Sequence, residues 1–248
     1  MRFRIVSYNI HRAIGVDRRF RPERIARILA HHDADVVLLQ EVDEGAPRSR
    51  EMDLARELAG ALGYKHVAVG HNVTLRKGRY GNATLCRFPI LRERNIDLTV
   101  WGRKRRGCQH TAVLLEGPGG GRNALDVFNL HLGLSARERE LQLGLLLRSR
   151  EFTELPPYAP TIVAGDFNDW RSRLQPILTG AAALRSATAP HGFFGRPMPT
   201  YPSFFPRGPL DRIYYRGRLR PVFARRCRLR LSRVASDHLP LVAEFAVR

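Results

Sequence analysis

A chain of 248 residues with 44% hydrophobic content is long enough to bury one large core, and we expect one domain over residues 1–248. No run approaches eighteen apolar residues and no apolar core of a secretion signal is present, so we expect neither a membrane span nor export and assign the chain to the cytoplasm. Three cysteines without CxxC spacing argue against a disulfide framework or a zinc site.

The formal net charge of +19 is the most unusual total. A field of that sign concentrates polyanions such as nucleic acid or acidic lipid surfaces. Three lysines among 42 basic residues leave 39 arginines, an imbalance that a GC-rich genome also produces. The charge excess, rather than the choice of arginine, therefore indicates the kind of partner.

The predicted elements in chain order mix strands with a few helices. Near-continuous apolar or β-rich runs predict strands at 2–9, 35–40, 126–131 and 161–164, and shorter β-like segments lie at 79–86, 108–115, 210–215, 228–231 and 239–247. Helices are predicted at 23–31 after Pro22, at 52–62 before Gly63, and from a capping box at Ser135 to about residue 152. We interpret the glycine-rich run 117–121 as a hairpin loop. Together these elements favour an α/β sandwich.

Polar side chains recur where apolar runs end. The segments are SYNIH with Ser7, Asn9 and His11, LQEV with Gln40 and Glu41, NLHL with Asn129 and His131, GDFND with Asp166, Asn168 and Asp169, LDR with Asp211, and SDH with Asp237 and His238. In an extended segment, residues two apart point to one side of the strand. Carboxylates that converge at buried strand ends repel one another unless a cation joins them, and Mg²⁺ prefers such oxygen ligands. Glu41 is the first candidate ligand.

Each residue also has a structural interpretation. Asp169 can cap the segment that follows it, and Asn129 can satisfy backbone groups. His11 or His131 taken alone is more often a hydrogen-bonded structural histidine, and Asp211 can form an ion pair with Arg212. The repetition of the pattern at several strand ends is what favours a shared site. The lack of a GxSxG motif argues against a serine hydrolase.

Taken together, SYNIH, LQEVD, NLHLG, GDFND, LDRIYY and SDHLP, in this order from Ser7 to Pro240, resemble the endonuclease/exonuclease/phosphatase superfamily, which includes DNase I. The resemblance implies a four-layer α/β sandwich, with two packed mixed β-sheets flanked by helices. It also implies metal-dependent hydrolysis of a phosphate ester, with Mg²⁺, or Mn²⁺ in its place, as the cofactor.

The resemblance also implies a role for each matching residue. Glu41 corresponds to the principal metal ligand, Asn9 to its neighbour and Asp237 to a further carboxylate near the metal. Asp166 corresponds to the residue that orients or deprotonates water, and Asn168 corresponds to the one that holds water or phosphate. His238 corresponds to a residue that contacts the phosphate, and Asp211 corresponds to the group that fixes the His238 tautomer. His131 corresponds to a second histidine, and Asn82 corresponds to a residue that lines the pocket. These roles agree with the chemistry of phosphate ester hydrolysis. The attacking water must lose a proton, which a carboxylate can accept, and the negative charge that accumulates on the phosphoryl oxygens is stabilised by a metal ion and a cationic histidine.

Three functions follow from these observations. A nuclease is favoured by the net charge, by the basic run 103–106 and by Arg228 and Arg230, which alternate with leucines and predict a basic strand face leading to His238. A phospholipid or sphingolipid phosphodiesterase acting at an anionic membrane surface is the alternative, supported by phenylalanines within 192–205. A noncatalytic anion-binding module is the third. His11, which stands where exonuclease III-like enzymes carry aspartate, is a candidate substrate contact, and His131 stands where they carry tyrosine.

Overall fold

Two six-stranded β-sheets form the centre of the computed structural model, which describes residues 1–116, 122–189 and 197–247. The first sheet has the order β11-β12-β1-β2-β4-β3, with β1 at Arg2–Asn9, β2 at Val36–Glu44, β3 at His66–Thr74, β4 at Arg79–Cys86, β11 at Leu219–Arg226 and β12 at Leu241–Val247. The second has the order β5-β6-β7-β8-β10-β9, with β5 at Ile90–Asp97, β6 at Gly107–Glu116, β7 at Arg122–His131, β8 at Thr161–Asp166, β9 at Arg185–Ser186 and β10 at Asp211–Arg216.

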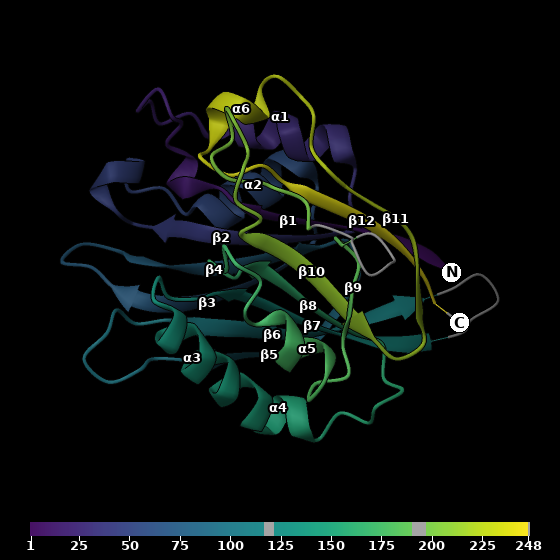
Figure 1. The fold of residues 1–248 in the computed structure, drawn as a ribbon. Helices are drawn as coiled ribbons and strands as arrows, with labels where there is room; N and C mark the ends of the chain where they lie inside the picture. The colour runs from purple at the N-terminus through teal and green to yellow at the C-terminus, as the bar shows by residue number, and fades with distance from the viewer. Residues whose placement is uncertain (117–121, 190–196, 248) are drawn as a thin grey trace.

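Helices cover the outer face of each sheet (Figure 1). The first sheet carries α1 (Pro22–His32), α2 (Leu54–Leu62) and α6 (Ser232–Ala235), and the second carries α3 (Ala136–Arg148), α4 (Arg150–Thr153) and α5 (Gln175–Thr179). Short 3₁₀ turns, η1 (His11–Ala13) and η2 (Pro47–Ser49), follow β1 and β2. The predicted four-layer α/β sandwich is confirmed. Within the described ranges, no helix is long and apolar enough to cross a membrane.

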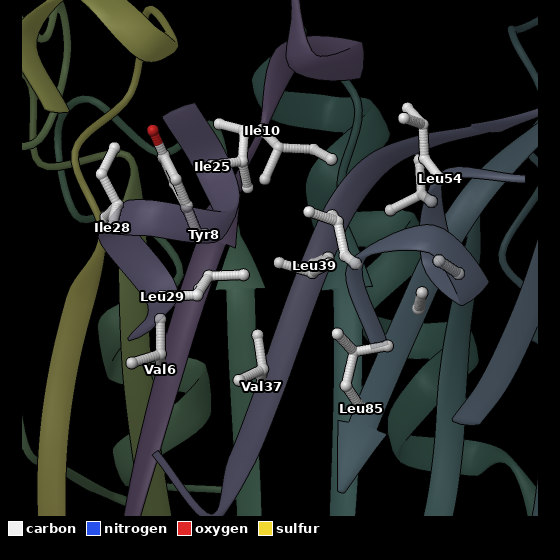
Figure 2. Close-up of a cluster of buried hydrophobic side chains, with 14 of the residues drawn as sticks. Val6, Tyr8, Ile10, Ile25, Ile28, Leu29, Val37, Leu39, Leu54 and Leu85 are labelled. Carbon is white, nitrogen blue, oxygen red and sulfur yellow. The ribbon is translucent and has the colours of Figure 1, made fainter. Parts of the chain in front are cut away.

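Strand alternation decides which side chains enter which layer. In β1, Phe3 and Ile5 join the apolar core between the two sheets, whereas Val6 and Tyr8 point the other way, toward α1. Figure 2 shows this outer layer, where Ile28 and other side chains of α1 pack on β1 and β2. A third apolar cluster joins β7, β8 and β10 to α3 and α5. Odd-numbered residues of β1 therefore continue along the inner face to its end at Asn9.

The local signals for helices are largely confirmed. Pro22 occupies the first turn of α1, and the Asp53 carboxylate caps α2, which ends at Gly63 with a positive φ of 72°. The capping box also forms, since the Ser135 hydroxyl accepts a hydrogen bond from the backbone N–H of Glu138 at 3.2 Å. The single helix expected from this box to residue 152 is wrong, however. Ser149 has an extended backbone with ψ of 148° and separates α3 from α4.

One predicted strand is also wrong. Residues 228–231 lie in the turn that leads into α6, and the strand in this region is β11, which ends at Arg226. Leu229 and Leu231 both pack against the outer apolar core, although the chain here is not extended. Their alternation with arginines therefore does not define a strand face. The glycine-rich run 117–121, expected to be a hairpin loop, lies outside the described residues.

Candidate active site

The inner faces of several strands end in polar side chains at the same edge of the sandwich. β1 is parallel to β2 and β7 is parallel to β8, so their carboxyl ends lie together, whereas β10 is antiparallel to β8 and begins at that edge. The register places Asn9 beside Gln40, and Asp166 between His131 and Asp211. Because all of these residues continue inward-facing rows of apolar side chains, the fold converts motifs distant in sequence into one site.

Asp166 is the centre of the site. Its Oδ2 accepts a hydrogen bond from Asn9 Nδ2 at 3.0 Å, and its Oδ1 accepts one from the backbone N–H of Asn168 at 2.9 Å. Two imidazole nitrogens approach the same Oδ2, His131 Nε2 at 3.5 Å and His238 Nε2 at 3.7 Å. Burial raises the pKa of Asp166 to about 7, against the opposing charge of His238. A carboxylate of this kind accepts a proton near neutral pH.

His238 lies between two carboxylates. Its Nδ1 is 2.8 Å from Asp211 Oδ2, which directs Nε2 toward Asp166. Burial alone would lower the pKa of His238, but the charges of Asp211 and Asp166 outweigh it and raise the pKa to about 10. The Thr200 hydroxyl donates to the same Asp211 Oδ2 and fixes the carboxylate. The expected Asp211–His238 pair is therefore present, and the imidazole carries a proton at neutral pH.

His131 and Asn168 complete the surroundings of Asp166. His131 is buried, and burial together with the charges of Arg106, His238 and Lys104 lowers its pKa well below the usual value, so the ring is neutral. Asn168 has a left-handed backbone with φ of 51°, and its Nδ2 donates to the Leu132 carbonyl at 2.9 Å. This backbone strain places Asn168 beside the carboxylate that its own N–H contacts.

Glu41 is positioned by a bulge in β2. The pairing of β2 with β4 shifts register between Leu39 and Val42, and Glu41 has a positive φ of 58°, which is costly for a residue with a Cβ. The bulge removes Glu41 from the regular alternation just after Gln40, the residue paired with Asn9. Its carboxylate lies 3.6 Å from Arg12 Nε.

The predicted metal neighbours lie around the same edge. Asn9 Oδ1 accepts a hydrogen bond from the backbone N–H of His11 at 3.1 Å, so its amide links the His11 turn to Asp166. Asp237 is partly exposed and follows Ser236, whose hydroxyl donates to the Asn9 carbonyl at 2.7 Å. The charge of Asp237 contributes to the raised pKa of His238, after burial and the nearer carboxylates.

A group of Asp166, Asp211 and His238 also offers three potential ligand atoms within 4.8 Å of one another. Two of these atoms are already joined, since His238 Nδ1 is hydrogen bonded to Asp211. The raised pKa of His238 keeps a proton on the nitrogen that faces Asp166. We therefore interpret this group as an ion-pair relay.

Several predicted residues join the two sheets. Asn82 Nδ2 donates to the carbonyls of Gly107 and Asn129 at 3.2 and 3.1 Å, across the space between the sheets. Asn129 donates to the Leu39 and Ala83 carbonyls and accepts from Gln40. Both amides thus use their donors on buried backbone, as buried polar groups generally must. Asn82 lies beneath the site as a structural bridge, and the structural interpretation of Asn129 is confirmed.

His11 and the two predicted arginines do not occupy their expected places. β1 ends at Asn9, and His11 lies in η1 with a φ of 46°, where its Nδ1 is 2.9 Å from the Ile14 carbonyl. The shared extended face of Asn9 and His11 is therefore wrong. Arg228 lines a separate cavity of about 470 Å³ with His31 and His32. Arg228 and Arg230 are both exposed and have no strand to align them toward His238.

Asp169 has the capping role expected of it. Its two carboxylate oxygens accept hydrogen bonds from the backbone N–H groups of Arg173 and Leu174 at 3.1 and 2.8 Å, just before α5. The carboxylates of GDFND therefore divide into Asp166 at the site and Asp169 in the adjacent turn.

A sequence comparison decides the family. The model of the Endonuclease/Exonuclease/phosphatase family matches residues 6–238. The chain belongs to this family. Members of the family hydrolyse phosphoester bonds. YbhP of Escherichia coli K12, an uncharacterized protein, is 34% identical over 252 residues, which cover 98% of this chain and 96% of YbhP.

Solved structures show the same fold at low identity. An endonuclease/exonuclease/phosphatase from Beutenbergia cavernae matches 99% of this chain and 72% of its own with a TM-score of 0.79 and 21% identity. The catalytic domain of human Nocturnin, with a bound sulfate anion, matches 100% of this chain and 94% of its own with a TM-score of 0.75 and 23% identity. These likenesses confirm the DNase I-like architecture of the family.

Sequence reasoning missed other residues at the site. Thr200, which holds Asp211, lies in a proline-rich stretch with no motif to mark it. The Tyr201 ring lies 5.1 Å from the His238 ring and also contacts Trp170 at 5.6 Å between centroids. Arg106 belongs to the basic run 103–106, and the sequence alone does not show that it is buried or that its charge acts on His131. Only the charge run could have drawn attention to Arg106.

Proposed function

We propose that this family member is a metal-dependent phosphodiester hydrolase. The single observation that carries the proposal is the position of His238, whose imidazole lies between Asp211 at 2.8 Å and Asp166 at 3.7 Å with its pKa raised to about 10. A buried cation beside a carboxylate that titrates near pH 7 supplies both functions that hydrolysis of a phosphate ester needs. One group accepts the proton of water, and the other stabilises charge on the phosphoryl oxygens.

The residues of the chain divide these tasks. Asp166 orients the attacking water and takes its proton, while His238 donates a hydrogen bond from Nε2 to a phosphoryl oxygen. Asp211 keeps His238 charged and orients the ring so that its Nε2–H points toward Asp166. Asn168, rigidly placed beside Asp166, positions the water or the phosphate, and neutral His131 offers a further hydrogen bond to the same group.

The donor set fits a hard divalent cation, Mg²⁺ or Mn²⁺. Glu41, Asn9 and Asp237 supply carboxylate and amide oxygens, which such ions prefer over nitrogen or sulfur. The strained backbone of Glu41 and the contact of its carboxylate with the cationic side chain of Arg12 are consistent with a carboxylate held ready for a ligand. Bound there, the ion would supply Lewis-acid stabilisation of the phosphoryl oxygens.

Nucleic acid is the substrate class that the surface supports best. The net charge of +19 favours a polyanion, and exposed Trp170 continues from Tyr201 and His238 as an aromatic row beside the site. Trp170 also lines a cavity of about 450 Å³ with Arg139, Arg171 and other residues. Aromatic faces next to cations suit bases and phosphates together.

A phospholipid phosphodiesterase is the second candidate, and exposed aromatics favour it. Trp101 is 98% exposed in the loop between β5 and β6, next to the basic run that begins at Arg103. Phe204 and Phe205 are also exposed, contrary to the general tendency of such residues to be buried. Phe193 and Phe194 of the same predicted loop lie outside the described residues. Aromatic tips with basic neighbours suit an anionic bilayer.

A substrate panel tests the proposal. Purified protein is incubated with plasmid DNA, single-stranded DNA, RNA, sphingomyelin, phosphatidylglycerol vesicles and bis-p-nitrophenyl phosphate, with Mg²⁺, with Mn²⁺ or with chelator. We expect chelator-sensitive turnover, fastest on nucleic acid, and its loss in Glu41→Gln. Hydrolysis of the lipids alone would favour the second candidate, and binding of nucleic acid without turnover of any substrate would favour a noncatalytic module.

A further inference from the structure

A cluster of four cations surrounds Tyr80 beside Glu41. The basic cluster consists of Arg12 from η1, Arg48 from η2, and Lys104 and Arg106 from the loop between β5 and β6. Lys104 Nζ lies 5.1 Å and Arg48 Cζ 5.4 Å from the centroid of the Tyr80 ring. Cations from three separate segments thus meet at one place, which distinguishes the cluster from a basic run along one segment.

The carboxylates near this cluster do not balance its charge. Asp43 accepts two hydrogen bonds from Arg48 at 2.8 and 2.7 Å and neutralises it. Glu41 lies 3.6 Å from Arg12 Nε, but Glu41 is also the proposed metal ligand. Among the described residues, neither Lys104 nor Arg106 has a carboxylate within ion-pair distance. The cluster therefore retains a local excess of positive charge.

Arg106 is the most informative member. The residue is only 8% exposed and its Nε is buried without a partner, whereas its terminal nitrogens are not fully buried and donate to no acceptor within the part of the chain that the structure describes. Arg139 and Arg212 also have one buried nitrogen without a partner, but each donates from another nitrogen, to the Leu134 carbonyl and to Ser172 Oγ. A guanidinium with a buried, unpartnered Nε and with terminal nitrogens that reach solvent can receive an anion that arrives from outside.

The basic cluster adjoins the catalytic residues. After burial, the charges of Arg106 and Lys104 contribute to the lowered pKa of His131, which contacts Asp166. Arg12 of the cluster lies 3.6 Å from Glu41, whereas His238 approaches Asp166 Oδ2 beside His131 and is hydrogen bonded to Asp211. An anion bound at the cluster would thus lie at the edge of the site, on the His131 and Glu41 side, rather than at the position where the scissile phosphate contacts His238.

We propose that Arg12, Lys104 and Arg106 bind a second phosphate group of the substrate, one that is not cleaved. The proposal rests on the proposed function and specifies its substrate as a phosphodiester carrying a further phosphate. The guanidinium fork of Arg106 suits bidentate contact with phosphate, and Lys104 adds a mobile point charge. The second phosphate can be the next internal diester of a nucleic acid or a terminal phosphomonoester.

Matched substrates distinguish these cases. Initial rates are measured for bis-p-nitrophenyl phosphate and a dinucleoside monophosphate, which have one phosphate, for a trinucleotide with two internal diesters, and for the dinucleotide with a terminal phosphate. The variants are Arg106→Met, Lys104→Met and Arg106→Lys, with Arg105→Met as the control because Arg105 is exposed in the same loop. We expect the first two to raise KM for two-phosphate substrates roughly ten- to hundredfold, as lost charge-assisted hydrogen bonds do, with little change in kcat.

One-phosphate substrates and Arg105→Met should show little change in KM. Arg106→Lys keeps the charge but loses the bidentate fork, so it should raise KM less than Arg106→Met does. Arg106→Met should melt at the same or a higher temperature, because it removes an unpartnered buried charge. An equal rise in KM for one- and two-phosphate substrates would overturn the subsite. Absence of all turnover in the wild type would refute the proposed function instead, and calorimetric binding of the same dinucleotides, with and without the terminal phosphate, would still decide the subsite.

Discussion

Replacement of Asp211 by Asn tests how the site holds its proton. The substitution preserves the shape of the side chain, and the Thr200 hydroxyl can still donate to an amide oxygen. The substitution removes the charge of Asp211, which is the largest effect that raises the pKa of His238. Burial, which lowers this pKa, is then opposed only by the charges of Asp166 and the more distant Asp237. The pKa should then fall from about 10 toward the ordinary value of about 6.5, and the ring should be largely neutral above neutral pH.

Two magnitudes follow. Loss of a preorganised cationic donor should lower kcat/KM about 10²- to 10³-fold at pH 8, and less at pH 6, where His238 is still protonated in the variant. A group whose pKa is higher in the folded than in the unfolded protein stabilises the fold below about pH 6.5, and this stability is lost as pH rises to about 10. For one proton, the free energy of unfolding changes by at most about 1.4 kcal/mol per pH unit in this range, and Asp211→Asn should reduce this pH dependence.

The assay is a pH–rate profile for bis-p-nitrophenyl phosphate together with urea unfolding from pH 6 to 10. NMR of the His238 ring protons reports its titration directly. An unchanged pH–rate profile and an unchanged His238 titration in Asp211→Asn would refute the assigned relay. A general loss of rate at every pH, with normal unfolding, would indicate that Asp211 acts otherwise than through His238.

Three further predictions concern stability and positioning. Asn129→Ala leaves buried carbonyls and Gln40 without their partners and should lower the free energy of unfolding by about 2–4 kcal/mol in urea titrations, while kcat stays within a fewfold of wild type. Gly165→Ala should abolish stable folding, seen as lost cooperativity in circular dichroism, because its Cβ would lie 1.9 Å from the Leu130 oxygen at a φ of +140°. Thr200→Val should reduce kcat/KM about tenfold with an intact thermal transition, since it frees Asp211.

The sequence predicts the layers well because alternation and helix signals are local. The inner rows of β1 and β8 begin with apolar residues and end at Asn9 and Asp166, so a strand prediction also predicts which way these side chains point. The same rule fails for His11, where the strand stops two residues earlier, and for Arg228, where alternating leucines pack on one core from a turn.

Residues recruited by tertiary packing could not be predicted in this way. Thr200 reaches Asp211 from a loop eleven residues earlier, and Arg106 reaches the site from a loop in which its neighbour Arg105 is exposed. Nothing in a basic run distinguishes a buried arginine from an exposed one. The role of the bulge at Glu41 likewise depends on the partner strand β4, whose register shift is not encoded in the LQEVD motif alone.

The central claim is that Asp166 activates water at this site, and the most direct measurement compares two substitutions in GDFND. Asp166→Asn and Asp169→Asn remove one carboxylate each, and Asn is a good replacement for the capping Asp169. With Mg²⁺ and the best substrate of the panel, we predict that kcat falls at least about 10²-fold in Asp166→Asn, the usual contribution of a general base, and only a fewfold in Asp169→Asn. Near-wild-type turnover by a folded Asp166→Asn variant would contradict the account.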